Sequence, residues 1–161
     1  MFDQQAEFAV LHRPRHERGR IRYVSVAIQF VLSSEKGRSL TDWRALPFAP
    51  ASGTRLCANG DVFEGQGKEI VFGEGKEAFR IVLFRLGERV LAYHNCCPHF
   101  SLPLNYEPEL FHVLDGGVLM CAHHTAMFHL ESGECFDGPC MGARLTPIRL
   151  VPDMDDWYVV A

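Results

Sequence analysis

The hydrophobic positions of this chain fall in short runs. After residue 40, brief segments rich in β-branched and aromatic residues alternate with turn residues, which is typical of strands. The predicted strands are residues 54–58, 69–72, 79–86, 89–95, 117–121, 126–130, 145–151 and 157–160. No 3.6-residue periodicity extends over a long stretch, so the sequence predicts a mainly β protein.

Turn residues between these runs indicate antiparallel pairing. Gly87-Glu88 separates two predicted strands and is typical of a hairpin, and Asp115-Gly116-Gly117 forms a similar turn before residues 118–121. One turn of helix is expected within each of residues 41–46 and 105–111. The predicted architecture is an antiparallel β-sandwich or small barrel.

Charge divides the chain near residue 40. Residues 1–40 carry a net charge of +3 and residues 41–161 a net charge of −7, so we expect a basic N-terminal extension followed by one domain. Residues 11–22, "LHRPRHERGRIR", are predicted to be a flexible polar arm, either simply solvated or used for targeting or docking. Residues 23–32 are compatible with a strand or a short helix.

Composition argues against nucleic-acid binding, a membrane span and a disulfide framework. The net charge of −4 gives no indication of nucleic-acid binding, and no apolar run approaches the ~18 residues of a membrane span. The first residues do not have the pattern of a signal peptide, so a cytoplasmic location is expected. In that setting the six cysteines are expected to be metal ligands or free thiols instead of a disulfide framework.

Two short loops each pair a cysteine with a histidine. Cys97 and His99 form C-x-H, and Cys121 and His124 form C-x-x-H after 21 intervening residues. Both a tetrahedral zinc site and a [2Fe–2S] cluster with two thiolate and two imidazole ligands use this set. Because each loop carries one ligand of each kind, and zinc fingers usually pair like ligands, the pattern favours the binuclear cluster.

The residues around these pairs resemble the Rieske [2Fe–2S] domain family. Residues 97–104 read "CPHFSLPL" against the family's C-P-H-R-G-x-P-L, and residues 121–128 read "CAHHTAMF", followed by Gly133 and Gly138-Pro139. The resemblance implies an ISP-like fold over residues 41–161, with a cluster-binding subdomain at one end built from loops 96–106 and 121–130. It implies a [2Fe–2S] cluster held by four ligands: Cys97, His99, Cys121 and His124.

Some positions depart from the family pattern. Ser101 and Thr125 stand where glycines are usual. High-potential members carry an extra, disulfide-forming cysteine in each loop, and Leu102 and Ala122 occupy those positions here. Ala126 and Phe128 stand where high-potential members have a serine and a tyrosine. The chain therefore resembles the low-potential Rieske-type ferredoxins of oxygenase systems.

The other cysteines and histidines are not expected to bind the cluster. The family pattern takes the third residue after Cys121, which is His124 and not His123. The remaining cysteines are expected to be structural, namely Cys57, Cys96, Cys135 and Cys140. Three further histidines have no partner at metal-ligand spacing, namely His94, His112 and His129.

The resemblance implies electron transfer and not catalysis. Only 37 residues follow His124, and the catalytic iron domain of an oxygenase is not expected within them. We therefore expect a ferredoxin that carries single electrons from a reductase to an oxygenase, and not an enzyme. Two alternatives stay open: a redox-sensing or structural module that uses the same cluster, and a Cys₂His₂ zinc protein.

Overall fold

The computed structural model describes residues 10–17, 20–27 and 42–160, which belong to two compact units, Met1–Arg38 and Ser39–Ala161. In the first unit, β1 (Val10–Glu17) and β2 (Arg20–Ala27) form an antiparallel hairpin. The prediction of a flexible arm over residues 11–22 is therefore wrong where these strands lie. Cross-strand pairing satisfies the backbone there, and β2 is rich in β-branched residues. Residues 28–32, left open between strand and helix, lie outside the described residues.

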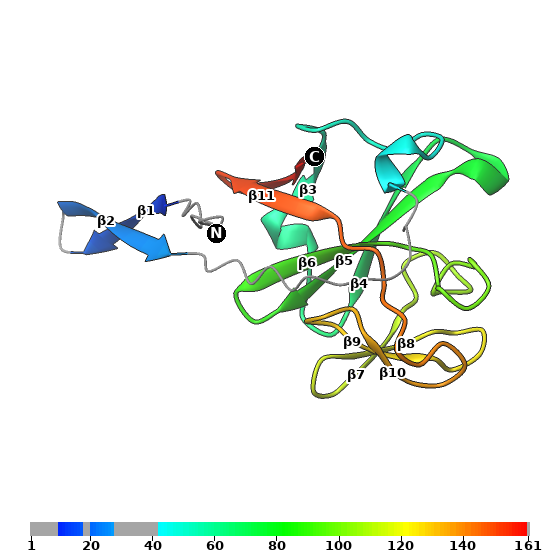
Figure 1. Cartoon of the computed structure of the whole chain (residues 1–161). Coiled ribbons are helices and arrows are strands. Elements are labelled where there is room, and N and C mark those ends of the chain that lie inside the picture. The colour runs from blue at the N-terminus through cyan, green and yellow to red at the C-terminus, as the bar shows by residue number, and fades with distance from the viewer. Residues whose placement is uncertain (1–9, 18–19, 28–41, 161) are drawn as a thin grey trace, which may run out of the picture. The chain divides into compact units, whose positions relative to one another are not determined.

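The second unit consists of three small antiparallel sheets, with strand orders β11-β12-β3, β4-β5-β6 and β10-β9-β8-β7. Figure 1 shows the β7–β10 sheet at one end of this unit and the sheet of β3 and β11 at the other. The strands are β3 (Arg55–Ala58), β4 (Gly67–Phe72), β5 (Phe79–Leu86), β6 (Arg89–His94), β7 (His112–Leu114), β8 (Val118–Met120), β9 (Met127–His129), β10 (Cys135–Asp137), β11 (Arg149–Asp153) and β12 (Asp156–Val160). The predicted mainly β fold is confirmed.

Strand β5 separates two hydrophobic cores. Successive side chains on a strand point to opposite faces, so Ile81 and Leu83 enter one core while Val82 and Phe84 enter the other. The body core lies against β3, β6 and β12 and includes Trp43, Leu56 and Trp157. The lobe core lies beneath β7–β10 and comprises Val82, Phe84, Tyr93, Cys97, Leu104, Phe111, Leu119, Cys121, Ala126, Phe128, Leu130, Cys135 and Leu145.

Most predicted strands have counterparts, and the differences have local causes. Residues 79–86 form β5 as predicted, and Gly87 makes the predicted turn with a φ of 60°. Strand β11 covers only the last part of the predicted run 145–151, since it begins at Arg149. Strands β7 and β10 were missed, because three residues are too few for a periodic pattern.

The two helical turns expected from the sequence had different outcomes. Trp43–Ala45 is a single 3₁₀ turn capped by the Asp42 side chain. Residues 105–111 contain a hydrogen-bonded turn, in which the Leu110 N–H donates to the Glu107 carbonyl at 3.1 Å, and no helix. Among the described residues, no helix has the length and apolar character needed to cross a membrane.

Candidate metal centre

The first ligand loop follows β6 and is closed by its own backbone. The Cys97 N–H donates to the Leu102 carbonyl at 2.7 Å, and the Ser101 N–H donates to the Cys97 carbonyl at 2.8 Å. The buried Asn95 side chain then accepts from the Leu104 N–H at 2.7 Å. These bonds hold Cys97 and His99 on a short loop whose two ends are joined.

The second ligand loop follows β8 and repeats the same scheme. The Cys121 N–H donates to the Ala126 carbonyl at 2.8 Å, and the Thr125 N–H donates to the Cys121 carbonyl at 3.1 Å. A further bond, from the Ala122 N–H to the Leu104 carbonyl at 2.9 Å, ties the second loop to the first. The two loops therefore share the same pattern of backbone hydrogen bonds and lie next to each other.

The two loop cysteines meet at the edge of the lobe core. Cys97 is 2% exposed and Cys121 is 1% exposed. A hydrogen bond between their side chains raises the pKa of Cys97 and lowers the pKa of Cys121. Backbone N–H groups of His123 and His124 also lower the pKa of Cys121. Cys121 is therefore the sulfur stabilised as thiolate, the form that binds metals.

The two loop histidines meet at the outer side of the loops. The ring centroids of His99 and His124 lie 4.8 Å apart at an interplanar angle of 89°. His99 is half-buried and its Nδ1 is a buried nitrogen without a hydrogen-bond partner, whereas His124 is exposed. A buried imidazole nitrogen without a partner is costly in a bare protein and is explained by a missing ligand. The donor set therefore has two buried sulfurs below two adjacent imidazoles.

The like donors lie in two pairs, one of sulfurs and one of imidazoles. Over residues 42–160, no group of three or more His, Cys, Asp or Glu side chains is placed to hold a single ion. A structural zinc needs four ligands around one ion. A Rieske cluster needs only two protein ligands per iron, which matches one sulfur pair and one imidazole pair.

Comparison with known protein families identifies the family of this domain. The model of the Rieske [2Fe-2S] domain matches residues 53–153, which covers most of the chain and both ligand loops. The chain belongs to the Rieske [2Fe–2S] domain family. No curated protein matches the chain.

Solved structures show the same fold. The Rieske domain described here is similar to the ferredoxin of carbazole 1,9a-dioxygenase from Nocardioides aromaticivorans IC177, with a TM-score of 0.53, 18% identity, and coverage of 68% of this chain and 98% of that chain. It is also similar to the terminal oxygenase of carbazole 1,9a-dioxygenase from Novosphingobium sp. KA1, with a TM-score of 0.57 and 14% identity, covering 68% of this chain and 30% of that chain. A third match is a chain in the complex of reduced oxygenase and oxidized ferredoxin in carbazole 1,9a-dioxygenase, with a TM-score of 0.53, 22% identity, and coverage of 66% and 91%.

The two residues that replace the usual Rieske glycines keep a glycine-like backbone. Ser101 has a φ of 57° and Thr125 a φ of 55°, at the same position of each loop. This conformation is strained for residues with a Cβ, and most of all for a β-branched one. The Ser101 hydroxyl bonds to Cys96, where it partly offsets the effect of burial, which raises the pKa of Cys96.

His123 has a different environment from His124. Its ring packs on Tyr106 with centroids 4.2 Å apart, and lies 6.3 Å from the His124 ring. Its Nε2 is also buried without a hydrogen-bond partner, so burial alone does not separate it from His99. The two histidines differ in position, because His124 and not His123 forms a close ring pair with His99.

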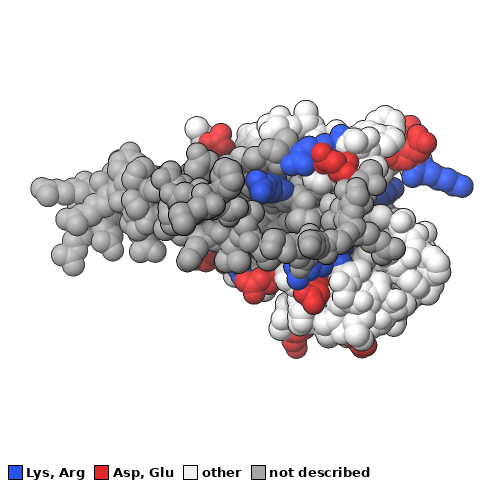
Figure 2. All heavy atoms as spheres, viewed as in Figure 1, with Lys and Arg blue, Asp and Glu red and all other residues white. Residues whose placement is uncertain are grey.

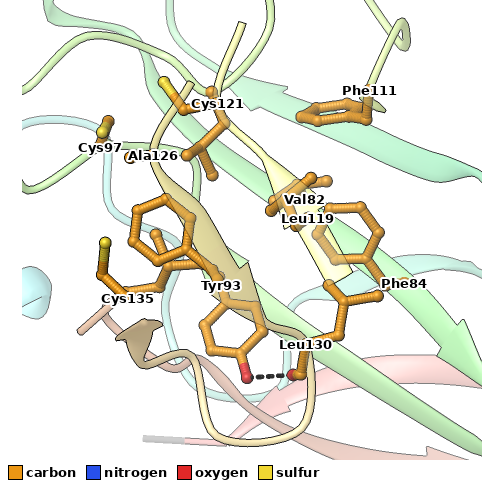
Figure 3. Close-up of a cluster of buried hydrophobic side chains, with 13 residues drawn as sticks. Val82, Phe84, Tyr93, Cys97, Phe111, Leu119, Cys121, Ala126, Leu130 and Cys135 are labelled. Carbon is orange, nitrogen blue, oxygen red and sulfur yellow. Dashed lines mark hydrogen bonds between the residues drawn. The ribbon is translucent and has the colours of Figure 1, made fainter. Parts of the chain in front are cut away.

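Two features near the site were not expected from the sequence. One is the buried polar network of Asn95, Asn105 and Glu69, in which Asn95 Nδ2 donates to both of the others. The other is a second pair of thiols, Cys135 and Cys140, which packs against the lobe core beside the loop cysteines. Figure 3 shows Cys97 and Cys135 on the side of this core opposite Phe84. The spacing C-x₄-C was the available signal for the second pair.

Proposed function

We propose that this chain binds a Rieske-type [2Fe–2S] cluster through Cys97, His99, Cys121 and His124, and that it transfers single electrons as a ferredoxin between a reductase and an oxygenase. The observation that carries the proposal is the pairing of like ligands across the two loops. Cys97 and Cys121 share a hydrogen bond in the core, and the rings of His99 and His124 meet above them. When bound, the cluster supplies one-electron redox chemistry.

The protein's own contribution is the placement of the ligands relative to solvent. Burying both cysteines keeps water from the sulfurs, while the exposed His124 leaves a short route from the site to the surface. Backbone N–H groups of His99, His123 and His124 point at the two ligand sulfurs. Such bonds stabilise negative charge on the sulfurs and favour the reduced state.

An apolar surface around the ligand histidines supports docking of a protein partner. Residues 96–106 and 121–128 contain no charged side chain, and Phe100 and Tyr106 are 64% and 68% exposed. On the face seen in Figure 2, the lobe that holds β7–β10 carries few charged atoms, mostly acidic ones at its edge. Large exposed aromatic side chains in a charge-poor patch are typical of interfaces. We call the exposed side chains of Phe100, Leu102 and Tyr106 the apolar tip.

The similar solved structures support this class of partner. They describe oxygenase and ferredoxin components of carbazole 1,9a-dioxygenase, including a complex of the two. A cytoplasmic location is part of the proposal, because none of the six cysteines forms a disulfide bond in the structure. A redox-sensing module with the same cluster is the second candidate, and it would not exchange electrons rapidly with a reductase.

The test is anaerobic purification followed by metal and sulfide analysis, visible absorption and EPR of the reduced protein. Two irons and two acid-labile sulfides per chain, with a rhombic signal of low average g-value, are expected. One zinc per chain with no visible absorption would overturn the cluster assignment. Stopped-flow oxidation by an oxygenase component then separates electron transfer from sensing. The reduced cluster of a sensor would be oxidised no faster with the oxygenase component than without it.

A further inference from the structure

The second thiol pair lies on a tight loop next to the ligand loops. Cys140 donates a hydrogen bond to the Cys135 sulfur with an Sγ–Sγ distance of 3.4 Å. A disulfide bond is about 2.05 Å long, so the two sulfurs need to approach by about 1.4 Å. Rotation about a side-chain χ1 angle moves a sulfur by a distance of this order. The Cys140 side chain also hydrogen-bonds to Cys97, one of the proposed ligands.

The backbone around the pair is already held in place. The Cys135 N–H donates to the Ala143 carbonyl and the Gly142 N–H donates to the Cys135 carbonyl, both at 2.8 Å. The Ala143 N–H donates to the Cys140 carbonyl at 2.9 Å. Both cysteines are therefore fixed by the same closed turn, and the approach of their sulfurs costs little chain entropy.

The two thiols differ in access, which sets an order of reaction. Cys135 is 1% exposed and its thiol also donates to the Asp137 carbonyl at 3.2 Å. Cys140 is half-buried and is therefore the more exposed of the two. An accessible thiol beside a buried one is the arrangement of an attacking and a resolving cysteine.

We infer that Cys135 and Cys140 are a reversible thiol-oxidation site. The two cysteines form a disulfide with each other by exchange with a low-molecular-weight disulfide such as oxidised glutathione. Cys140 attacks one sulfur of oxidised glutathione, and the other glutathione leaves as a thiolate. Cys135 then attacks the Cys140 sulfur of the mixed disulfide, and the second glutathione leaves. The two protein protons pass to the two glutathione thiolates, so one disulfide is reduced as the other forms.

This site is coupled to the second ligand loop by close packing. Gly138, within the same turn, has a φ of 97°, and a Cβ there would lie 2.8 Å from the Ala126 Cα. Thr125 and Ala126 belong to the loop that carries Cys121 and His124. The turn of residues 135–143 thus packs directly against that loop. A disulfide between Cys135 and Cys140 therefore restricts the motion of the turn beside the proposed cluster site.

The test is thiol mapping of the full chain, loaded with iron and sulfide as purified, in buffers of reduced or oxidised glutathione. After the protein is unfolded in denaturant and its free thiols are alkylated, a protease that cuts after glutamate releases residues 135–161, which contain only these two cysteines. In reduced buffer this peptide is expected to carry two alkyl groups, and in oxidised buffer none, with the loss of two hydrogens. Cys57, buried in the body core, is the internal control and is expected to stay alkylatable in both.

Three results would overturn the inference: two alkyl groups in both buffers, a stable glutathione adduct on Cys140, or a disulfide that joins residues 135–161 to another peptide. Cys140→Ser is the matched variant, which keeps a small polar side chain and is expected to leave Cys135 alkylatable in oxidised buffer. The inference goes beyond the proposed function. If no cluster is present the peptide is still measurable, and if no disulfide forms the iron and sulfide content is unaffected.

Discussion

The Asn95 side chain joins the two ends of the first ligand loop, because its Oδ1 accepts a hydrogen bond from the Leu104 N–H at 2.7 Å. The same side chain donates to Asn105 Oδ1 at 2.7 Å and to Glu69 Oε1 at 2.8 Å. Glu69 is itself only 8% exposed and pairs with Arg80 at 3.2 Å. One buried amide therefore closes the loop and helps to satisfy a buried carboxylate.

Asn95→Ala is expected to lower the free energy of unfolding by about 2 kcal/mol, because it leaves buried polar groups of its partners unsatisfied. Iron content should fall as well, since the loop that carries Cys97 and His99 is no longer closed. Urea denaturation and iron analysis check this. Arg89→Ala, which removes an exposed ion pair with Glu131, is the control and should change stability by less than about 1 kcal/mol. Equal effects of the two variants would contradict the role of Asn95.

Replacing any proposed ligand should abolish normal cluster assembly, because each replacement removes a bond to iron. The variants are Cys97→Ser, His99→Ala, Cys121→Ser and His124→Ala. His123→Ala is the matched control and should retain iron and colour, since His123 packs on Tyr106 instead of on His99. Visible absorption and metal analysis measure the result. If His123→Ala loses the cluster while His124→Ala keeps it, the ligand assignment is wrong.

Thr125→Gly should stabilise the fold by about 1 kcal/mol, because glycine relieves the strain of a β-branched residue at a φ of 55°. Part of the gain is offset by the greater flexibility of glycine in the unfolded chain. Chemical denaturation of both proteins gives the difference. Thr54→Gly, at a position outside the positive-φ residues, should instead destabilise. A loss of stability in Thr125→Gly as large as in Thr54→Gly would show that the positive φ carries no strain.

The midpoint potential should lie near the low end of the Rieske range, about −150 mV. Ala126 and Phe128 are both 0% exposed and cannot donate hydrogen bonds at positions where high-potential members have hydroxyls. Ala126→Ser should raise the potential by on the order of tens of millivolts, since a new donor stabilises the reduced state. Ala49 packs against the body core, and Ala49→Ser is the control, whose potential should stay at the wild-type value. Protein-film voltammetry decides, and a wild-type midpoint above roughly +100 mV would overturn the low-potential prediction.

The apolar tip should carry much of the binding energy for a redox partner. Phe100→Ser and Tyr106→Ser are each expected to weaken partner binding by on the order of tenfold, because exposed aromatic residues are frequent interface anchors. Met154→Ser removes a similarly exposed apolar side chain in the β11–β12 turn and should have no effect. Stopped-flow electron transfer at varied partner concentration measures this. Equal rates for all three variants would place the docking surface elsewhere.

The sequence by itself determined the β class, the family and the residues proposed as ligands. Short β-branched runs and turn residues are local signals, so β5 and the Gly87 turn followed from them directly. The cysteine and histidine positions are equally local, because each pair lies within four residues of one loop. The hairpin of β1 and β2 was missed, since its first strand is too polar to show a strand pattern.

Only the tertiary structure decided which distant residues meet. The pairing of His99 with His124 and the network of Asn95 with Glu69 both depend on how the loops pack on the lobe core. The positive φ values of Ser101 and Thr125 also come from this packing, because their own preferences oppose them. Local propensity acts over a few residues, whereas burial and hydrogen bonding across the chain select one arrangement among many that the same local pattern allows.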